Sequence, residues 1–420
     1  MTLTPPARYL FLQGPASPFF SRLGATLQAR GHLVFRINFN GGDRVLWHGR
    51  NATDYQGDEA AWPAFLRDYA GRNAITDIVL LNDCRPLHRL AIAVARALGI
   101  ATHIFESGYI RPNWLTLEKQ GVNGFSTLPR NMEDVLRIAE RLPPPRDAVE
   151  VKETLSGRAL NDVIYSSATF LLSWRYPRYR RDWPYGQAAE YAFGGLRLVR
   201  GILRGFQRQR QVDRIASGAT PFYLLPLQIE ADSQIRFHSP YASQAEVIRL
   251  VMQSFSQFAP AGTQLVITEH PLETCPTNWR RIVAEQAALC GVTERVVFLA
   301  GGTDFELVES CRGMLVINSS TGQDALVFRK PLIALAPAVY NLPGLTFQGK
   351  LDEYWVEAVP ADPELVAAFR RVLIAETQIN GGFFSDKGIA LAIENSLPVL
   401  ERKAKISPDG YASTQPLQAF

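Results

Sequence analysis

The stretch PFYLLPLQIEAD, residues 221–232, decides the fold, because an apolar strand-like run ends there in a short polar cluster. Two later stretches repeat this pattern, QLVITEHP at 264–271 and MLVINSSTG at 314–322. In an open α/β sheet a ligand lies outside the carboxyl ends of the strands, so the three clusters can converge on one crevice. They supply carboxylates, an imidazole and a hydroxyl-rich turn. Such a set suits the departure of a phosphate-bearing group from a carbon centre.

Strand-like and helix-like segments alternate on both sides of this stretch. Helices are predicted at 17–30, 87–98, 243–257 and 277–290, among others. Repeated β-α-β order predicts parallel, doubly wound sheets, so we expect an α/β protein with two Rossmann-like domains. The predicted strands are 8–13, 33–39, 77–82, 102–105, 222–228, 264–268, 296–300, 314–318 and 331–336.

The length of 420 residues also favours two domains, because a single hydrophobic core stops growing beyond about 250–300 residues. We expect an N-terminal Rossmann-like domain at 1–150 and a basic, aromatic helical linker at 151–218. A C-terminal Rossmann-like domain would follow at 219–375, with a closing helix and tail at 376–420.

The composition is that of a globular protein, with 47% hydrophobic and 20% charged residues. A formal charge of +4 is too small to indicate nucleic-acid binding. The four cysteines form no C-x-x-C pair, which indicates reduced, structural cysteines in a cytoplasmic protein. No signal-like segment and no run of about 20 apolar residues is present, so we expect neither export nor a membrane span.

The linker differs in character from the rest of the chain. Between residues 171 and 214, ten arginines face three acidic residues, which leaves +7, and aromatic residues lie among them. This pattern is typical of a segment on an anionic membrane surface, with Arg197, Arg200 and Arg204 as candidate contacts. The alternative is a solvated helical linker whose aromatic residues pack into a domain interface.

The first polar cluster offers candidate catalytic carboxylates. If the strand continues in extended form, Gln228, Glu230 and Asp232 lie on one side of it. A carboxylate here can act as nucleophile or base, and a neighbouring carboxyl group can raise its pKa. The alternative is that one of the acids caps the next helix. His238 is a weaker second candidate and is expected to be structural.

The other two clusters offer donors to an anion. Proline fixes the backbone at His270-Pro271, and the imidazole can donate to a phosphate oxygen. Ser319, Ser320 and Thr321 present hydroxyl and N–H groups where a helix begins, which suits a phosphate or a carboxylate. A plain helix cap is the alternative for this serine cluster.

Polar residues also end the strands of the N-terminal half. They predict a second ligand-lined crevice, although each one alone is an ordinary turn residue. The candidates are Gln13, Gly14, Asn38, Asp83 and Glu106.

Missing motifs narrow the chemistry further. The chain has no Asp-x-Asp, no Walker-type loop and no G-x-G-x-x-G after its first strand. Divalent-metal catalysis, NTP hydrolysis and the usual dinucleotide binding are therefore disfavoured. We expect a transferase without metal or cofactor, in which protein groups stabilise the leaving group.

These motifs resemble those of the bacterial capsular polysaccharide Kdo transferases. Q-x-x-x-D corresponds to Gln228–Asp232, H-P to His270-Pro271, and the serine motif to Ser319-Ser320. The stretches FLQGPASPFF, RINFNGGD, NDCRPLH and FESGYIRPNWLTLEKQGVNGFSTLPR resemble the single-module members of that group, over about residues 15–375. The chain departs from the resemblance at Ser107, where a second acid is expected beside Glu106.

The resemblance implies a two-domain GT-B type glycosyltransferase fold and a retaining β-Kdo transfer. The donor would be CMP-β-Kdo and the acceptor lysophosphatidylglycerol, at the cytoplasmic side of the inner membrane. Asp232 would attack C2, while His270 and residues 319–321 take the charge on departing CMP. Gln228 would position the sugar or Asp232, and Glu230 or Glu106 would be the base for the acceptor.

The same resemblance implies partners in capsule assembly, namely a two-module Kdo transferase and the capsule export machinery. The N-terminal strand ends and the linker would then serve the lipid acceptor. Two other functions stay open from the sequence: a CDP-alditol phosphotransferase of similar fold, in which the histidine is the base, and a non-catalytic capsule assembly protein.

Overall fold

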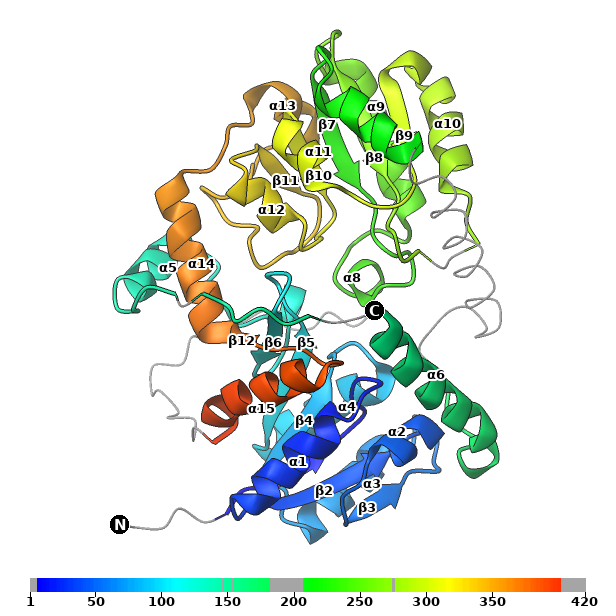
Figure 1. Cartoon of the computed structure of the whole chain (residues 1–420), viewed down its shortest axis with the longest axis vertical. Helices are drawn as coiled ribbons and strands as arrows, with labels where there is room; N and C mark the ends of the chain where they lie inside the picture. The colour runs from blue at the N-terminus through cyan, green and yellow to red at the C-terminus, as the bar shows by residue number, and fades with distance from the viewer. Residues whose placement is uncertain (1–5, 146, 153–154, 182–206, 274–275, 402–420) are drawn as a thin grey trace.

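The computed structural model describes residues 6–145, 147–152, 155–181, 207–273 and 276–401. It has two α/β halves, each built on its own sheet, with the N-terminal half at the bottom of Figure 1 and the C-terminal half at the top. The predicted α/β fold of two Rossmann-like domains is confirmed. Every predicted strand has a counterpart in one of the two sheets.

The N-terminal sheet has seven strands in the order β12-β6-β5-β4-β1-β2-β3. Strands β1 to β5 run parallel, whereas β6 pairs antiparallel with β5, and β12 pairs antiparallel with β6. The bounds are β1 (Arg8–Phe11), β2 (Leu33–Asn38), β3 (Ala52–Asp54), β4 (Asp77–Leu81), β5 (Ala101–Ser107), β6 (Trp114–Glu118) and β12 (Gln378–Asn380).

The helices of this half follow ordinary start and stop signals. Helix α4 begins at Pro86, where no intrahelical N–H bond is lost, and ends before Gly99, whose φ of 67° suits the left-handed region. Helix α4 spans Pro86–Leu98, and the other helices are α1 (Phe19–Ala29), α2 (Gly41–Leu46) and α3 (Trp62–Arg72), with the short η1 (Asn123–Phe125) after β6.

The C-terminal sheet is entirely parallel, in the order β11-β10-β7-β8-β9. Its central strand β7 is buried along its whole length, as expected for a strand covered on both faces. The strands are β7 (Phe222–Pro226), β8 (Gln264–Thr268), β9 (Val296–Leu299), β10 (Gly313–Val316) and β11 (Leu332–Ala334). The helices are α8 (Ser233–Arg236), α9 (Gln244–Phe258), α10 (Trp279–Leu289), η3 (Thr293–Arg295), α11 (Phe305–Ser310), α12 (Gly322–Val327) and α13 (Leu351–Glu357).

Some segments pack against the half of the molecule to which their position in the sequence would not assign them. Helix α5 (Met132–Ala139) packs on α14 (Pro363–Thr377) and belongs to the same apolar cluster as the C-terminal sheet. The chain then returns to the N-terminal half as β12 and α15 (Asp386–Glu401), where Arg30 pairs with Glu401 at 2.5 Å. Among the described residues the chain therefore passes between the two halves more than once, and two of these passages are the segment after β6 and helix α14.

The linker contributes one long described helix. Helix α6 (Leu155–Leu171) and the following η2 (Ser173–Arg175) lie on the N-terminal half, where α6 packs against α2. The candidate membrane contacts Arg197, Arg200 and Arg204 lie outside the described residues. Among the described residues, no helix is both long and apolar enough to cross a bilayer.

Candidate active site

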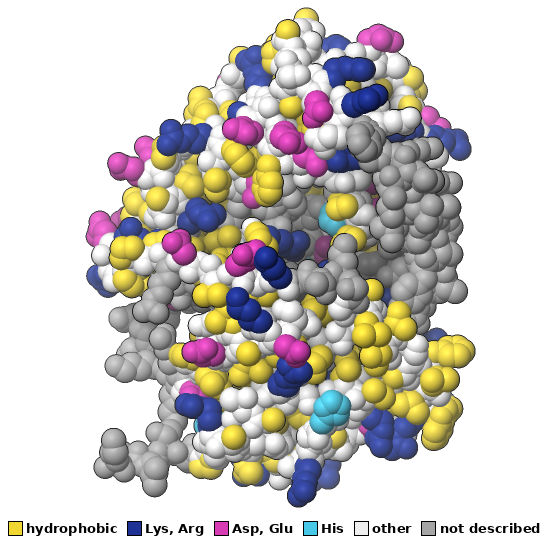
Figure 2. Space-filling model, in the orientation of Figure 1, with side chains coloured by type: hydrophobic (Ala, Val, Ile, Leu, Met, Phe, Trp, Pro, Cys, Tyr) yellow, Lys and Arg dark blue, Asp and Glu magenta, His cyan; other side chains and the backbone are white. Residues whose placement is uncertain are grey.

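A cavity lies at the boundary between the two halves, where Figure 2 shows the surface hollowed. Both sheets contribute the carboxyl ends of parallel strands to its wall, which is where open α/β sheets bind ligands. The N-terminal half supplies Asn82 and Glu106, after β4 and at the end of β5. The C-terminal half supplies Gln228, Asp232, His270, Asn318, Ser319 and Ser320.

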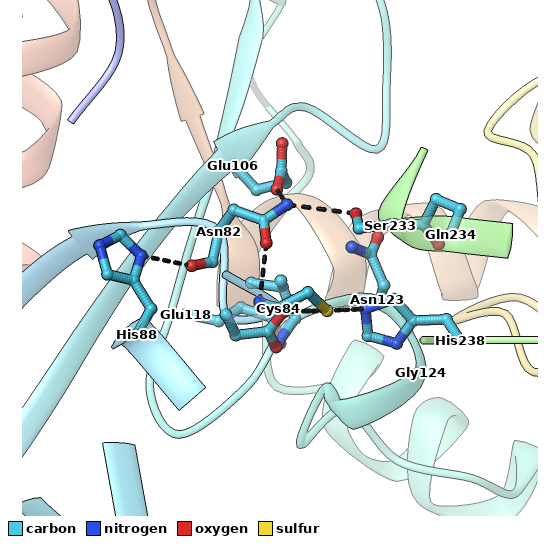
Figure 3. A network of polar contacts seen from close by, with 12 residues as sticks. Asn82, Cys84, His88, Glu106, Glu118, Asn123, Gly124, Ser233, Gln234 and His238 are labelled. Carbon is cyan, nitrogen blue, oxygen red and sulfur yellow. Dashed lines mark hydrogen bonds and ion pairs between the residues drawn. The ribbon is translucent and has the colours of Figure 1, made fainter. Parts of the chain in front are cut away.

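Asn82 bridges the two halves at the bottom of this cavity. Its Nδ2 donates to Glu106 Oε2 at 2.9 Å and to Ser233 Oγ, across the boundary, at 3.2 Å (Figure 3). The backbone of Asn82 has a φ of 65°, a left-handed conformation that asparagine tolerates better than most residues. Its side chain thus holds Glu106 close to the start of α8.

Asp232 both caps a helix and lines the cavity. Its Oδ1 accepts from Gln234 N at 3.0 Å and from Ser233 Oγ at 3.2 Å, so the cap expected as an alternative is present. Both of these hydrogen bonds go to one oxygen. The second oxygen, Oδ2, therefore remains available for a ligand in the cavity.

Glu230 points elsewhere. Its Oε2 accepts from Gln244 N at 3.1 Å, at the first turn of α9, and it does not line the cavity. Burial raises its pKa, whereas the contact with Gln244 lowers it. Strand β7 ends at Pro226 and a turn follows at residues 230–231, so the extended geometry that would align Glu230 with Asp232 is absent. Glu230 acts as a helix cap in this arrangement, which disfavours a role as base.

Gln228 and Asn318 join the ends of β7 and β10. Gln228 Nε2 donates to Asn318 Oδ1 at 3.1 Å, and Asn318 Nδ2 donates to Gln234 O and His238 O, each at 3.0 Å. The strand order reverses between β7 and β10, and such a switch point opens a crevice at the sheet edge. Gln228 therefore fixes the serine cluster against α8 and forms part of the cavity floor.

His270 is oriented to donate into the cavity. Its Nδ1 accepts from Leu272 N at 3.0 Å, so the proton of the neutral ring belongs on Nε2. Burial lowers the pKa of His270, and Arg111 lowers it further, against the opposing effects of Glu273 and Asp232. The lowered pKa favours the neutral ring, which carries its proton on Nε2 as a donor. Pro271 does not line the cavity and packs beside Gly302.

The serine cluster divides into two parts. Ser319 and Ser320 line the cavity, whereas Thr321 lies behind them with its hydroxyl 3.0 Å from Ser319 Oγ. Tyr340, which also lines the cavity, donates its OH to Ser319 O, and Gly322 lets the phenol approach, because a Cβ at residue 322 would lie 2.5 Å from the Tyr340 hydroxyl oxygen. The turn is thus held rigidly with two hydroxyls facing the cavity.

Glu106 is the second carboxylate at the cavity. Burial raises its pKa, and the charges of Asp232 and Asp83 raise it further, whereas Ser107 N, which donates to Oε1 at 2.9 Å, lowers it. A glutamate with a raised pKa is a better proton acceptor at neutral pH than an ordinary one. Glu106 and Asp232 therefore form a pair of carboxylates from opposite halves of the molecule.

The other candidates of the N-terminal half do not reach this cavity. Gln13 Nε2 donates to Tyr165 OH at 2.6 Å, and Asn38 Nδ2 donates to Asp54 Oδ1 at 3.0 Å. Gly14 lines a separate small depression beneath α6. Since the partners of Gln13 and Asn38 are protein groups, their placement disfavours contact with an acceptor.

Asp83 belongs to a buried cluster with Cys84 and His238, and Figure 3 shows the contact between Cys84 and His238. Their potential ligand atoms lie within 4.8 Å of one another. Cys84 Sγ and His238 Nε2 are 3.0 Å apart, whereas zinc bonds of about 2.3 and 2.1 Å in a tetrahedral site imply about 3.6 Å. Asp83 Oδ2 is already engaged by Val122 N at 2.8 Å. We interpret the cluster as a hydrogen-bonded contact between the two halves.

Sequence reasoning missed Arg111 and Gln323, which also line the cavity. Arg111 follows β5, close enough to influence the pKa of His270, and supplies a cation near the predicted phosphate site. Gln323 Nε2 donates to Tyr109 O at 2.8 Å, whereas its buried Oε1 has no protein partner. Arg111 belongs to the stretch FESGYIRPNW, part of the sequence that carries the family resemblance. Only the fold brings this arginine to His270.

The family model for capsule polysaccharide biosynthesis proteins matches residues 76–384, a range that includes both walls of the cavity. The chain belongs to this family. The expectation from the sequence motifs that this is a capsular polysaccharide biosynthesis protein is thereby confirmed.

Full-length relatives agree with this assignment. The chain is 33% identical to the Escherichia coli capsule polysaccharide export protein KpsS over 90% of this chain and 97% of the relative. It is 32% identical to the Neisseria meningitidis serogroup B capsule polysaccharide modification protein LipB, over 90% and 91%. The solved Thermosulfurimonas dismutans KpsC, a beta Kdo 2,7 transferase, is similar at 12% identity and a TM-score of 0.45, covering 94% of this chain and 100% of that one.

Proposed function

We propose that this member of the capsule polysaccharide biosynthesis family is a retaining β-Kdo transferase. It would move Kdo from CMP-β-Kdo to lysophosphatidylglycerol and thereby begin the linker of a capsular polysaccharide. The observation that carries the proposal is the carboxylate pair, Asp232 and Glu106, which faces one cavity together with the donors of His270 and the serine cluster. Retention requires such a nucleophile and a separate base.

In the first displacement, Asp232 Oδ2 attacks C2 of Kdo. The bond from C2 to the phosphate oxygen breaks, and its electron pair leaves with CMP. His270 Nε2–H, Arg111 and the hydroxyls of Ser319 and Ser320 stabilise the phosphate charge, because buried donors aimed at a developing charge lower the barrier. The product of this step is a Kdo ester of Asp232.

In the second displacement, Glu106 accepts the proton of the acceptor hydroxyl. The hydroxyl oxygen attacks C2 from the face that CMP left, and Asp232 departs as a carboxylate. Two inversions give net retention. Asn82, which donates to Glu106 Oε2, keeps this carboxylate on the acceptor side of the cavity.

The hydrogen bonding of His270 argues against the alternative CDP-alditol phosphotransferase. In that mechanism the imidazole removes a proton and therefore needs a ring nitrogen free to accept it. Here Nδ1 already accepts from Leu272 N, so the neutral ring offers a donor at Nε2. The geometry suits charge stabilisation better than base catalysis.

The test is a transfer assay with CMP-Kdo and a fluorescent lysophosphatidylglycerol, followed by mass spectrometry of lipid and protein. The wild type should add one Kdo to the lipid, and the anomeric configuration, read by NMR, should be β. Asp232→Ala should still bind CMP but transfer nothing. Normal turnover by this variant would show that Asp232 is not the nucleophile. Absence of transfer by the wild type would show that the protein does not catalyse the proposed reaction.

Glu230→Gln serves as the matched control. It changes a carboxylate two residues from Asp232 that caps α9 and does not line the cavity. We expect transfer close to the wild-type rate, with a modest loss of stability from the altered cap.

A further inference from the structure

Helix α6 packs on the N-terminal half with its polar face inward. The hydroxyl of Tyr165 accepts from Gln13 Nε2 at 2.6 Å and from Asn40 Nδ2 at 2.8 Å, and Thr169 Oγ1 accepts from Gly42 N at 3.2 Å. The helices approach closely because α2 begins with two glycines. A Cβ on Gly41 would lie 2.1 Å from Ala168 O, and one on Gly42 would lie 2.5 Å from the Tyr165 ring.

The outward face of α6 and η2 is apolar. Its large side chains recur at helical spacing, and five of them are between 52% and 75% exposed. Figure 2 shows hydrophobic side chains gathered on the right edge of the lower half, where Figure 1 places α6. The five are Leu160, Val163, Phe170, Leu171 and Trp174, and the less exposed Ile164 lies on the same face.

This polarity is the reverse of an ordinary surface helix, whose apolar face lies against the core. The inward polar contacts fix the orientation, so the helix cannot rotate to bury its apolar face without breaking them. An exposed apolar stripe of this kind marks a surface that a membrane or another protein covers.

The charges beside the stripe indicate which phase covers it. From residue 155 to 181 the chain carries five arginines and one acid, Asp162. Arg158 is exposed near the start of the stripe, and Arg178 and Arg180 are exposed just beyond its end. Phospholipid phosphates match such flanking cations, while Trp174 suits the depth of the headgroups.

We propose that the outward face of α6 and η2 lies in the headgroup and upper acyl region of an anionic bilayer and holds the N-terminal half on it. The proposal deepens the proposed function, on which it rests only for the location of the acceptor. It assigns the membrane contact to residues 160–174. The sequence had instead suggested the arginines at 197, 200 and 204.

Vesicle flotation of the full chain, without donor or acceptor, tests the proposal. The wild type should float with phosphatidylglycerol vesicles and much less with phosphatidylcholine vesicles. The triple variant F170S/L171S/W174S should lose at least about tenfold in partition, because it removes three apolar side chains from the surface that the bilayer would bury. The matched control L289S/V356S/V359S changes side chains of 69% to 78% exposure on the C-terminal half and should float like the wild type.

Thermal unfolding of both triple variants should match the wild type, because exposed substitutions change stability by about 0.5 kcal/mol or less. Transfer to a water-soluble short-chain acceptor should also be unchanged by F170S/L171S/W174S. Three results would overturn the proposal: no flotation of the wild type, unchanged flotation of this variant, or equal binding to both lipids. Light scattering that shows a dimer lost in the variant, without vesicle binding, would instead assign the stripe to a second copy of the chain. Since flotation needs no turnover, it tests membrane binding even if the transfer reaction fails.

Discussion

The strand ends of the C-terminal half and the ends of β1 and β2 in the N-terminal half differ in what covers them. In the C-terminal half the ends of β7, β8 and β10 open into the cavity, and Asp232, His270 and Ser319 face it. In the N-terminal half α2 and α6 lie against the polar groups that follow β1 and β2. The hydroxyl of Tyr165 accepts hydrogen bonds from the side chains of Gln13 and Asn40. We call the first set the open end and the second set the covered end.

The difference teaches that a polar strand end becomes a site only if the following elements leave it open. At the covered end the charges are fully enclosed: Arg36 and Asp43 are 3% and 2% exposed and pair at 2.9 Å. Arg36 also donates to Asn38 Oδ1 at 3.0 Å. These residues stabilise the fold, whereas the equally polar open end supplies a ligand site. The same substitution should therefore have opposite consequences at the two ends.

Asp232→Asn at the open end should have the largest effect. Asparagine caps a helix as well as aspartate does, so the thermal midpoint should stay near the wild-type value. Transfer should fall by about 10⁴-fold, because the amide cannot act as nucleophile. Steady-state kinetics and thermal unfolding on one preparation check both parts. If the variant lost stability and activity together, Asp232 would be a structural cap. The proposed difference between the open end and the covered end would then be wrong.

Asp43→Asn at the covered end should do the reverse. It leaves Arg36 as a buried charge without its partner, which costs about 3–5 kcal/mol of the free energy of unfolding. Urea unfolding measures this loss. Turnover per folded molecule should stay within a few fold of the wild type below the unfolding transition. A near-neutral stability change would mean that the covered end is open to water.

Glu106→Gln should reduce transfer by about 10²-fold, the usual contribution of a general base. In the wild type, burial and the charges of Asp232 and Asp83 raise the pKa of Glu106, and only the deprotonated form accepts a proton. Activity should therefore fall as the pH drops through this raised pKa, above the ordinary value of about 4.3 for glutamate. A pH profile of kcat/KM should lose this acid limb in Glu106→Gln. An unchanged limb would assign the base to another group.

Gly41→Ala should have the smallest effect of the four. The new Cβ would meet Ala168 O, so α6 must shift outward, at a cost of about 1–3 kcal/mol for an overpacked contact. Gly71→Ala in α3 is the control, since nothing lies within 4 Å of its added Cβ, and it should be neutral or slightly stabilising. Chemical denaturation of the pair separates the α2–α6 contact from the general effect of adding a methyl group.

Much of the fold followed from local pattern. Alternating apolar and polar segments predicted the parallel C-terminal sheet and the parallel strands β1, β2, β4 and β5, whereas the prediction of a fully parallel N-terminal sheet was wrong, because β6 and β12 are antiparallel. The caps of α4 are visible as Pro86 and Gly99 in the sequence. Strands β3, β6 and β12 were not predicted. The three residues of β12 carry no periodicity of their own and gain their partners only from β6. The return of α15 to the N-terminal half likewise depends on contacts with residues more than 350 positions away.

For the site, the sequence by itself determined which polar residues end the strands of each sheet, since the position of a strand end is a local property. It therefore identified Asp232, His270, Ser319, Ser320 and Glu106. Only the tertiary structure decided which of the candidates share a cavity. It turned Glu230 toward the N–H of Gln244, closed α6 over Gln13, and brought Arg111 to His270. The physical reason is that side-chain convergence depends on how the two halves dock and which helix lies over which strand end, and no local pattern encodes that.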